Sequence, residues 1–209
     1  MTGPSGGPLG VLSRIRSQRP EPSPYERCEM CGAPVADEHS HVVNVASRSL
    51  LCSCRPCYLL FTHDDAALAY RAVPDRHLSF GVLPAPVFDE LELPVGIAFL
   101  FVNSAIGRVV AFYPGPAGAT ESELPLLAWE NVVKAVPQLA AIKADVEALL
   151  VHTVDGQVEA FLVPIDVCYE LVGHLRLLWR GFDGGQEVRE RLAGFFDTVR
   201  LRARPGGAP

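Results

Sequence analysis

The sequence lacks any run of about 18 consecutive apolar residues, the length that a membrane-spanning helix requires, so we expect no membrane span. Residues 1–8 contain no apolar segment, so we expect no secretory signal peptide. An excess of basic charge is also missing, because 18 Lys and Arg against 24 Asp and Glu give a net charge of −6. Nucleic-acid binding normally needs a basic face. We therefore expect a cytoplasmic protein with no nucleic-acid partner.

Motifs of the common enzyme classes are missing too. The sequence contains no H-E-x-x-H, no G-x-S-x-G and no dinucleotide-binding fingerprint. The loop at residues 114–119 is rich in glycine and proline, but no Gly-Lys-Ser/Thr follows it, so we interpret it as a rigid connection. Cys168 lies on the apolar face of a predicted helix, which favours a buried core cysteine over a nucleophile. We expect a protein without enzymatic activity.

What the sequence does contain is a concentration of cysteine. All but one of its six cysteines lie between residues 28 and 57, and they include two C-x-x-C pairs, Cys28/Cys31 and Cys54/Cys57. This spacing is typical of four-thiolate metal sites, because each C-x-x-C segment turns both sulfur atoms toward one ion. Short β-prone runs between the pairs, with a turn at residues 46–48, predict a hairpin. The pattern predicts a zinc-ribbon module that binds Zn2+ through Cys28, Cys31, Cys54 and Cys57.

Three further residues leave the ligand set open. Cys52 lies two residues before Cys54, so on a strand both side chains would point to the same face, and Cys52 is an alternative ligand. His39 and His41 are potential ligands as well, although a surface or structural role is the simpler interpretation of each.

Iron is the alternative metal, because rubredoxin sites also use two C-x-x-C segments. In those sites each segment is usually followed by glycine, whose backbone lets N–H groups reach the sulfur atoms. Cys31 is followed by Gly32, as in that pattern, but Cys57 is followed by Tyr58. The departure at the second pair favours structural zinc over redox iron.

The chain divides into a metal module and a larger domain. We expect a disordered tail at residues 1–24 and a zinc-ribbon-like four-cysteine module at residues 25–62. A packed linker at residues 63–94 leads into an α+β domain at residues 95–204, and residues 205–209 form a loose tail. The apolar run at residues 58–61 is expected to pack the metal module onto the larger domain.

The larger domain combines hairpins with amphipathic helices. Two hairpins are predicted from apolar runs at residues 97–102, 108–113, 146–154 and 158–163. Capping-box spacing at residues 120–123 predicts a helix over about 125–136, and two later segments show helical periodicity. This pattern predicts an α+β fold with a mainly antiparallel sheet of about four strands and three helices.

Several segments are together similar to one known family. They are RCEMCGAP at 27–34, LLCSCRPC at 50–57, YRAVPDR at 70–76, AFYPGPAGATES at 111–122, VPIDVCYELV at 163–172 and WRGFDGG at 179–185. The chain resembles an uncharacterised bacterial family, a domain of unknown function, over most of residues 25–204. Genes of that family often lie near those for NiFe hydrogenases. The resemblance implies an accessory role in hydrogenase maturation, assembly or electron delivery, and it supplies no catalytic residues.

Three functions are compatible with these features. The first is a non-enzymatic metal-binding accessory protein with a protein partner, which the resemblance implies to be a hydrogenase subunit. The second is a rubredoxin-like electron-transfer protein with iron at the four cysteines. The third is a metal chaperone, in which Cys52, His39 and His41 would act as exchangeable ligands. We take the first as the hypothesis.

Overall fold

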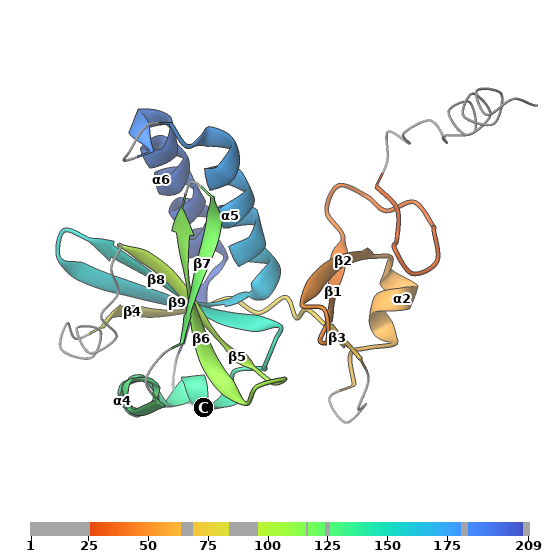
Figure 1. The fold of residues 1–209 in the computed structure, drawn as a ribbon, viewed down its shortest axis with the longest axis horizontal. Helices are drawn as coiled ribbons and strands as arrows, with labels where there is room; N and C mark the ends of the chain where they lie inside the picture. The colour runs from red at the N-terminus through yellow and green to blue at the C-terminus, as the bar shows by residue number, and fades with distance from the viewer. Residues whose placement is uncertain are drawn as a thin grey trace, which may run out of the picture.

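The computed structural model describes residues 26–63, 69–83, 96–115, 117–123, 126–180 and 184–206. Within these residues the chain forms a small lobe around a three-stranded sheet and a larger body around a seven-stranded sheet (Figure 1). The predicted α+β class is confirmed, whereas the tail predicted for residues 1–24 lies outside the described residues. No helix in the described part of the chain is both long and apolar enough to cross a membrane.

The small lobe is built on the predicted hairpin. Its sheet has the order β2-β1-β3, with strands β1 Ser40–Asn44, β2 Ser49–Ser53 and β3 Tyr70–Ala72. Asn44 closes the turn between β1 and β2, because its Oδ1 accepts hydrogen bonds from the N–H groups of Ala46 and Ser47. The described residues of this lobe bury few side chains, chiefly Cys28, Val42, Val43, Ser53 and Val73. The lobe therefore has only a small apolar core.

Helix α2 Arg55–Leu59 follows β2 and carries part of the apolar run that was expected to join the two lobes. Tyr58 packs within the small lobe, where its hydroxyl donates a hydrogen bond to the carbonyl of Val73 at 3.1 Å. Leu59 and Leu60 are instead 51% and 67% exposed. The prediction that the whole run packs the module onto the body is wrong, because a helical turn sends its members to different sides.

The large sheet has the order β10-β4-β9-β8-β5-β6-β7, with seven strands where about four were predicted. Its strands are β4 Leu78–Leu83, β5 Ile97–Asn103, β6 Arg108–Gly115, β7 Gly118–Glu123, β8 Glu147–Val154, β9 Gln157–Pro164 and β10 Arg204–Pro205. The predicted hairpins are β5–β6 and β8–β9. Three additional strands come from segments that were expected to be irregular: β4 from the linker, β7 from the loop and β10 from the end of the chain. Of these three, β4 and β7 pair in antiparallel direction and β10 pairs in parallel.

Strand β7 corrects the expectations for the loop at residues 114–119 and for the capping box at residues 120–123. β7 pairs with β6 in antiparallel register, with Thr120 opposite Tyr113. The helix predicted over about 125–136 is confirmed as α4 Leu126–Ala135, although residues 120–123 pair as a strand. The hairpin prevails because strand pairing satisfies backbone groups along the whole segment, whereas a cap satisfies only those of one helical turn.

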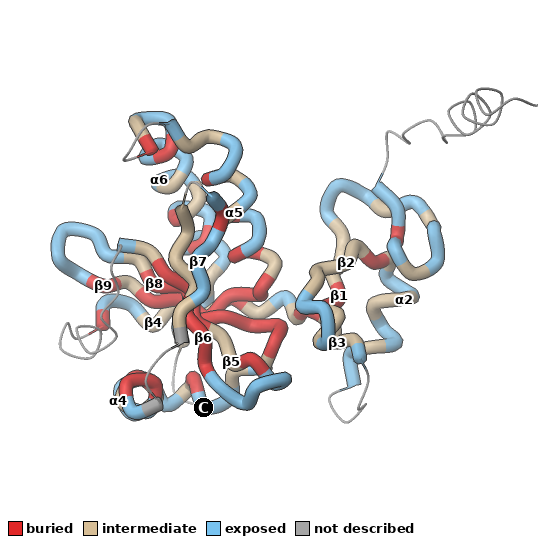
Figure 2. Tube along the Cα trace, in the orientation of Figure 1, coloured by how far each residue is buried: buried red, intermediate tan, exposed pale blue. Residues whose placement is uncertain are grey.

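Helices cover both faces of the large sheet. α5 Ile165–Leu178 and α6 Gly185–Arg202 pack on one face, while α4 and the short 3-10 helix Pro137–Ala141 pack on the other. Neighbouring residues of a central strand consequently enter different cores, as Leu149 and Leu150 do. Figure 2 shows the buried residues concentrated in this sheet. Burial on both faces explains why the central strands are nearly continuous apolar runs.

Candidate metal centre

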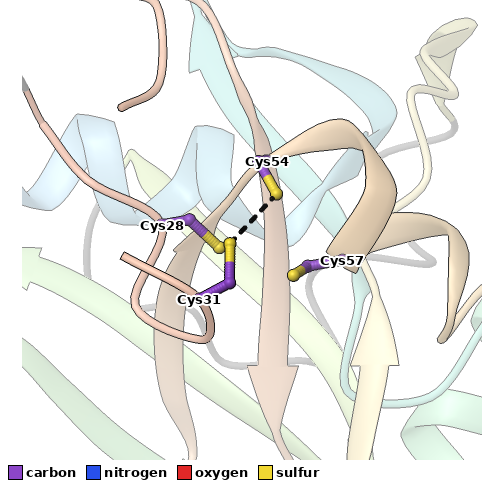
Figure 3. Close-up of side chains that lie close together, drawn as sticks. All are labelled: Cys28, Cys31, Cys54 and Cys57. Atoms are coloured by element: carbon purple, nitrogen blue, oxygen red, sulfur yellow. Dashed lines mark hydrogen bonds between the residues drawn. The ribbon is translucent and has the colours of Figure 1, made fainter. Parts of the chain in front are cut away.

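The two C-x-x-C pairs converge at one end of the small lobe (Figure 3). The four sulfur atoms of Cys28, Cys31, Cys54 and Cys57 all lie within 4.8 Å of one another. Sγ of Cys31 is 3.6 Å from Sγ of Cys54. A disulfide would need about 2.05 Å, whereas zinc–sulfur bonds of about 2.3 Å in a tetrahedron place the sulfur atoms about 3.8 Å apart. The four cysteines therefore have the donor type and spacing of a four-coordinate metal site.

The first pair lies on a tight turn stabilised by backbone hydrogen bonds. The N–H of Gly32 donates to the carbonyl of Cys28, and the N–H of Cys28 donates to the carbonyl of Ala33, each at 2.8 Å. Gly32 has a φ of +75°, a conformation that costs glycine little and other residues more. The glycine after Cys31 is thus required by the turn that points both sulfur atoms inward.

The second pair lies on a different element. Cys54 is the residue before α2 and Cys57 lies in its first turn, where the N–H of Tyr58 donates to the carbonyl of Cys54 at 2.9 Å. Residues three apart on a helix face the same side, so this turn also brings two sulfur atoms together. Pro56 suits the first helical positions, where no N–H partner is needed. The order is turn, hairpin and short helix, and the absence of a glycine after Cys57 agrees with this helix.

The cysteines of the cluster differ in how readily they ionise. Burial raises the pKa of Cys28, but N–H groups of Cys54, Cys31 and Met30 point at its sulfur and lower that pKa to about 6. Hydrogen bonds with the sulfur atoms of Cys54 and Cys31 raise the pKa of Cys57 to about 12. The Cys28 thiolate is therefore stabilised, whereas the raised pKa values of Cys31 and Cys57 keep those two thiols protonated, and a bound dication would favour their ionisation.

Cys52, the alternative ligand, is not part of this group. Its N–H donates to Oε2 of Glu29 at 2.7 Å and its carbonyl accepts from the N–H of Glu29 at 2.9 Å, which ties the first turn to β2. Its side chain lies instead with His39 and His41, and one ligand atom from each of these three lies within 4.8 Å of the others. The structure therefore groups Cys54 with the three other cysteines, and metal ligation by them stays a prediction.

Cys168 has the buried position expected from the sequence. Its side chain is fully buried between α5 and the sheet, and burial raises the pKa of its thiol well above the usual value. Of the two histidines nearest in sequence, His152 stacks on Phe196 and His174 hydrogen-bonds with Arg191. Cys168 thus lacks the exposed thiolate that a nucleophile needs.

The small lobe contacts the body through Val43 and Val73, which belong to a buried apolar cluster of the body, and through polar side chains that sequence reasoning did not identify. The hydroxyl of Tyr169 donates to the carbonyl of Arg48 at 2.9 Å, and Arg71 donates to the Asp145 carboxylate at 2.9 Å. Tyr169 and Arg48 are 121 residues apart, so no local pattern links them. A cleft of about 680 Å³ remains between the lobes, and its lining includes His39, His41, Tyr58, Asp166, Tyr169 and Arg202.

Comparison with known proteins gives one match. The sequence profile of a family of unknown function (DUF5947) matches residues 27–203, which begin just before Cys28 and end beyond α6. No curated protein and no solved structure matches the chain. The cysteine cluster and strands β4 to β9 of the large sheet lie inside the matched span, so they form one family unit, and β10 follows directly after it.

Proposed function

The chain belongs to the DUF5947 family of unknown function, and from its geometry we propose that it is a non-enzymatic metal-binding accessory protein that acts through protein–protein contacts. The observation that supports this function most is the convergence of the four sulfur atoms of Cys28, Cys31, Cys54 and Cys57 within 4.8 Å. A closed set of four protein ligands is the arrangement of structural metal sites, whereas catalytic sites keep a position open.

The role of the metal is to hold the small lobe together. The described part of that lobe buries few apolar side chains, so its own core offers little stability. A metal bound by both C-x-x-C pairs links the first turn, β2 and α2 at one point. The lobe then becomes a rigid attachment that presents its outer residues in a fixed arrangement.

Zinc is the metal that we assign, and iron is the alternative. The second pair lies at the start of α2 and is followed by Tyr58, so it lacks the glycine turn of an iron site. Elemental analysis and an absorption spectrum of protein purified without oxygen test this assignment. We expect colourless protein whose zinc is lost in Cys28→Ser, and iron with reversible visible bands would instead indicate electron transfer.

Leu59 and Leu60 support a protein contact at the metal-bound end. These two neighbouring side chains are 51% and 67% exposed, directly after the helical turn that carries Cys57. Neighbouring apolar side chains that stay exposed on a rigid support favour a protein contact at that surface. The family resemblance makes a subunit of a NiFe hydrogenase the partner that we propose.

Co-elution of the full chain with purified hydrogenase subunits tests the partner. We expect one subunit to co-elute with the wild-type chain, and the double variant Leu59→Asp/Leu60→Asp to reduce binding at least tenfold, because each change places a charge in an apolar contact. Leu127→Asp is the matched control, since Leu127 is 72% exposed on α4 of the body. Absence of binding to every subunit, or equal loss in the control, would contradict the proposal.

A further inference from the structure

We propose that His39, His41 and Cys52 form a second, open metal site that faces the cleft between the lobes and binds a divalent first-row transition-metal ion. One ligand atom from each of these residues lies within 4.8 Å of the other two. His39 and His41 line the cleft, so an ion could reach the site from solvent. The proposal is independent of the hydrogenase partner and concerns ligands outside the four-cysteine cluster.

The site follows from the register of the small sheet. β1 and β2 pair so that His41 is directly opposite Cys52. Directly opposed residues place their Cβ atoms about 4.5–5.5 Å apart, on the same face of the sheet. His39 precedes His41 by two residues and lies beside it, with ring centroids 4.7 Å apart. A shift of one residue in this register would move Cys52 to the opposite face and separate the three ligands.

His39 provides the clearest independent sign of a ligand. Its Nδ1 is 2.9 Å from the carbonyl oxygen of Ala36, which can only accept, so Nδ1 carries the proton and Nε2 has a free lone pair. Nε2 is buried and has no hydrogen-bond partner. Oε2 of Glu26 is 3.5 Å away, but a carboxylate oxygen only accepts hydrogen bonds and so cannot donate one to this lone pair. A metal ion would satisfy this otherwise costly buried nitrogen.

His41 is oriented in the manner of metal-binding histidines. Its Nδ1 lies 2.9 Å from Oδ2 of Asp166, a residue at the start of α5 in the body. Donation from Nδ1 to the carboxylate leaves Nε2 as the nitrogen available to a metal, and a carboxylate behind a histidine increases its basicity as a ligand. Asp166 is therefore a positioning residue for this site, supplied from across the cleft.

The donor set determines which ions fit and how they are held. Two imidazoles and one thiolate suit ions of the cobalt-to-zinc part of the first transition row, and they suit magnesium or calcium poorly. Three protein ligands leave a fourth coordination position for water or an incoming ligand. The site is thus exchangeable, in contrast to the closed cluster formed by the four other cysteines.

A cobalt titration of the full zinc-loaded chain tests the site after dialysis against a mild chelator, which removes exchangeable metal. We expect uptake of about one Co2+ per chain with a thiolate-to-cobalt absorption band. Cys52→Ala should abolish that band, and His39→Ala and His41→Ala should each weaken Co2+ binding, while the retained zinc shows that the lobe is still folded. His174→Ala, which changes a histidine on α5, should bind Co2+ as the wild type does.

Asp166→Asn gives a second readout, because it preserves the shape of the side chain but removes the charge behind His41. Loss of such an outer partner typically weakens metal affinity 10–100-fold, and we expect a decrease in that range with the zinc retained. Absence of Co2+ uptake in the wild type would overturn the proposal. A loss of zinc in Cys52→Ala, without any loss of zinc in His39→Ala or His41→Ala, would also overturn the proposal. Cys52 would then be a ligand of the four-cysteine cluster.

Discussion

Three histidine nitrogens in the described residues are buried without a hydrogen-bond partner, namely Nε2 of His39, Nε2 of His77 and Nδ1 of His152. His39 lies beside Cys52, where a metal ion would use its free nitrogen. Neither His77 nor His152 belongs to a group of potential metal ligands in the described residues. Burial lowers the pKa of His77, helped by Arg202, and burial lowers the pKa of His152 despite the opposing charge of Glu159. Both rings are therefore neutral in the folded protein at neutral pH.

The lowered pKa of His152 predicts a loss of stability in mild acid. The unfolded chain protonates this ring near its ordinary pKa of 6.5, whereas the folded protein does so only at lower pH. The unfolded state thus binds more protons, and the free energy of unfolding decreases as the pH falls through 6.5 toward the folded-state pKa. His152→Phe keeps the ring that stacks on Phe196, with centroids 3.8 Å apart, but cannot titrate.

Urea unfolding of the full chain at about pH 7.5 and about pH 5.5 measures this dependence. When the pH is lowered from about 7.5 to about 5.5, we expect the urea midpoint of unfolding to decrease less for His152→Phe than for the wild type. The control His174→Phe, on the polar side of α5, should fall as much as the wild type. An identical decrease in all three proteins would show that His152 does not contribute.

At the scale of elements, the junction before α6 depends on glycine. Gly184 and Gly185 have φ values of +81° and +78°, and α6 begins at the second of them. A Cβ on Gly184 would lie 3.1 Å from Cγ1 of Val188, whose side chain is buried. Gly173, within α5, has no atom within 4 Å of where its Cβ would be. Gly184 is therefore required by both its backbone conformation and its packing, whereas the space around Gly173 would accept a side chain.

Substitution of these glycines by alanine should change stability in opposite directions. Gly184→Ala is expected to lower the free energy of unfolding by about 1–3 kcal/mol, because it combines a left-handed conformation with a close contact. Gly173→Ala is expected to raise it by about 0.5–1 kcal/mol, because alanine restricts the unfolded chain and favours the helix. Urea unfolding measures both values, and an unchanged Gly184→Ala would contradict the described junction.

At the scale of the whole molecule, stability is divided unequally between the lobes. Two apolar cores lie on the two faces of the seven-stranded sheet, and Val43 and Val73 are what the small lobe contributes to one of them. The described small lobe has a few buried side chains and the four converging cysteines. Loss of a metal ion from those cysteines should therefore affect one lobe far more than the other.

Metal removal by a strong chelator should unfold the small lobe and leave the body folded. Hydrogen exchange followed by mass spectrometry would show this as loss of amide protection in β1 and β2, with protection retained in β8 and β9, which serve as the internal control. Cys57→Ser should give the same pattern without chelator. Retained protection in β1 and β2 would mean that the cysteines do not stabilise the lobe, and loss throughout would mean that the lobes unfold together.

Local patterns in the sequence determined much of this protein. The spacing of the C-x-x-C pairs identified the four cysteines that converge, because a turn of fixed length sets the direction of both sulfur atoms. The hairpins β5–β6 and β8–β9 and helices α5 and α6 were evident for the same reason, since their apolar periodicity and turn residues lie within one segment. Cys168 was correctly assigned to the core from its position on the apolar face of a helix.

Tertiary structure alone decided the features that join distant segments. Strands β4, β7 and β10 carry weak local signals and exist because a sheet edge offers them backbone partners. The register of β1 on β2 placed Cys52 with His41, and the packing of α5 placed Asp166 behind that ring. A hydrogen bond between residues 125 positions apart depends on how the two lobes pack. Local sequence patterns do not predict how the lobes pack, because the contacts that stabilise this packing form only when the chain has folded.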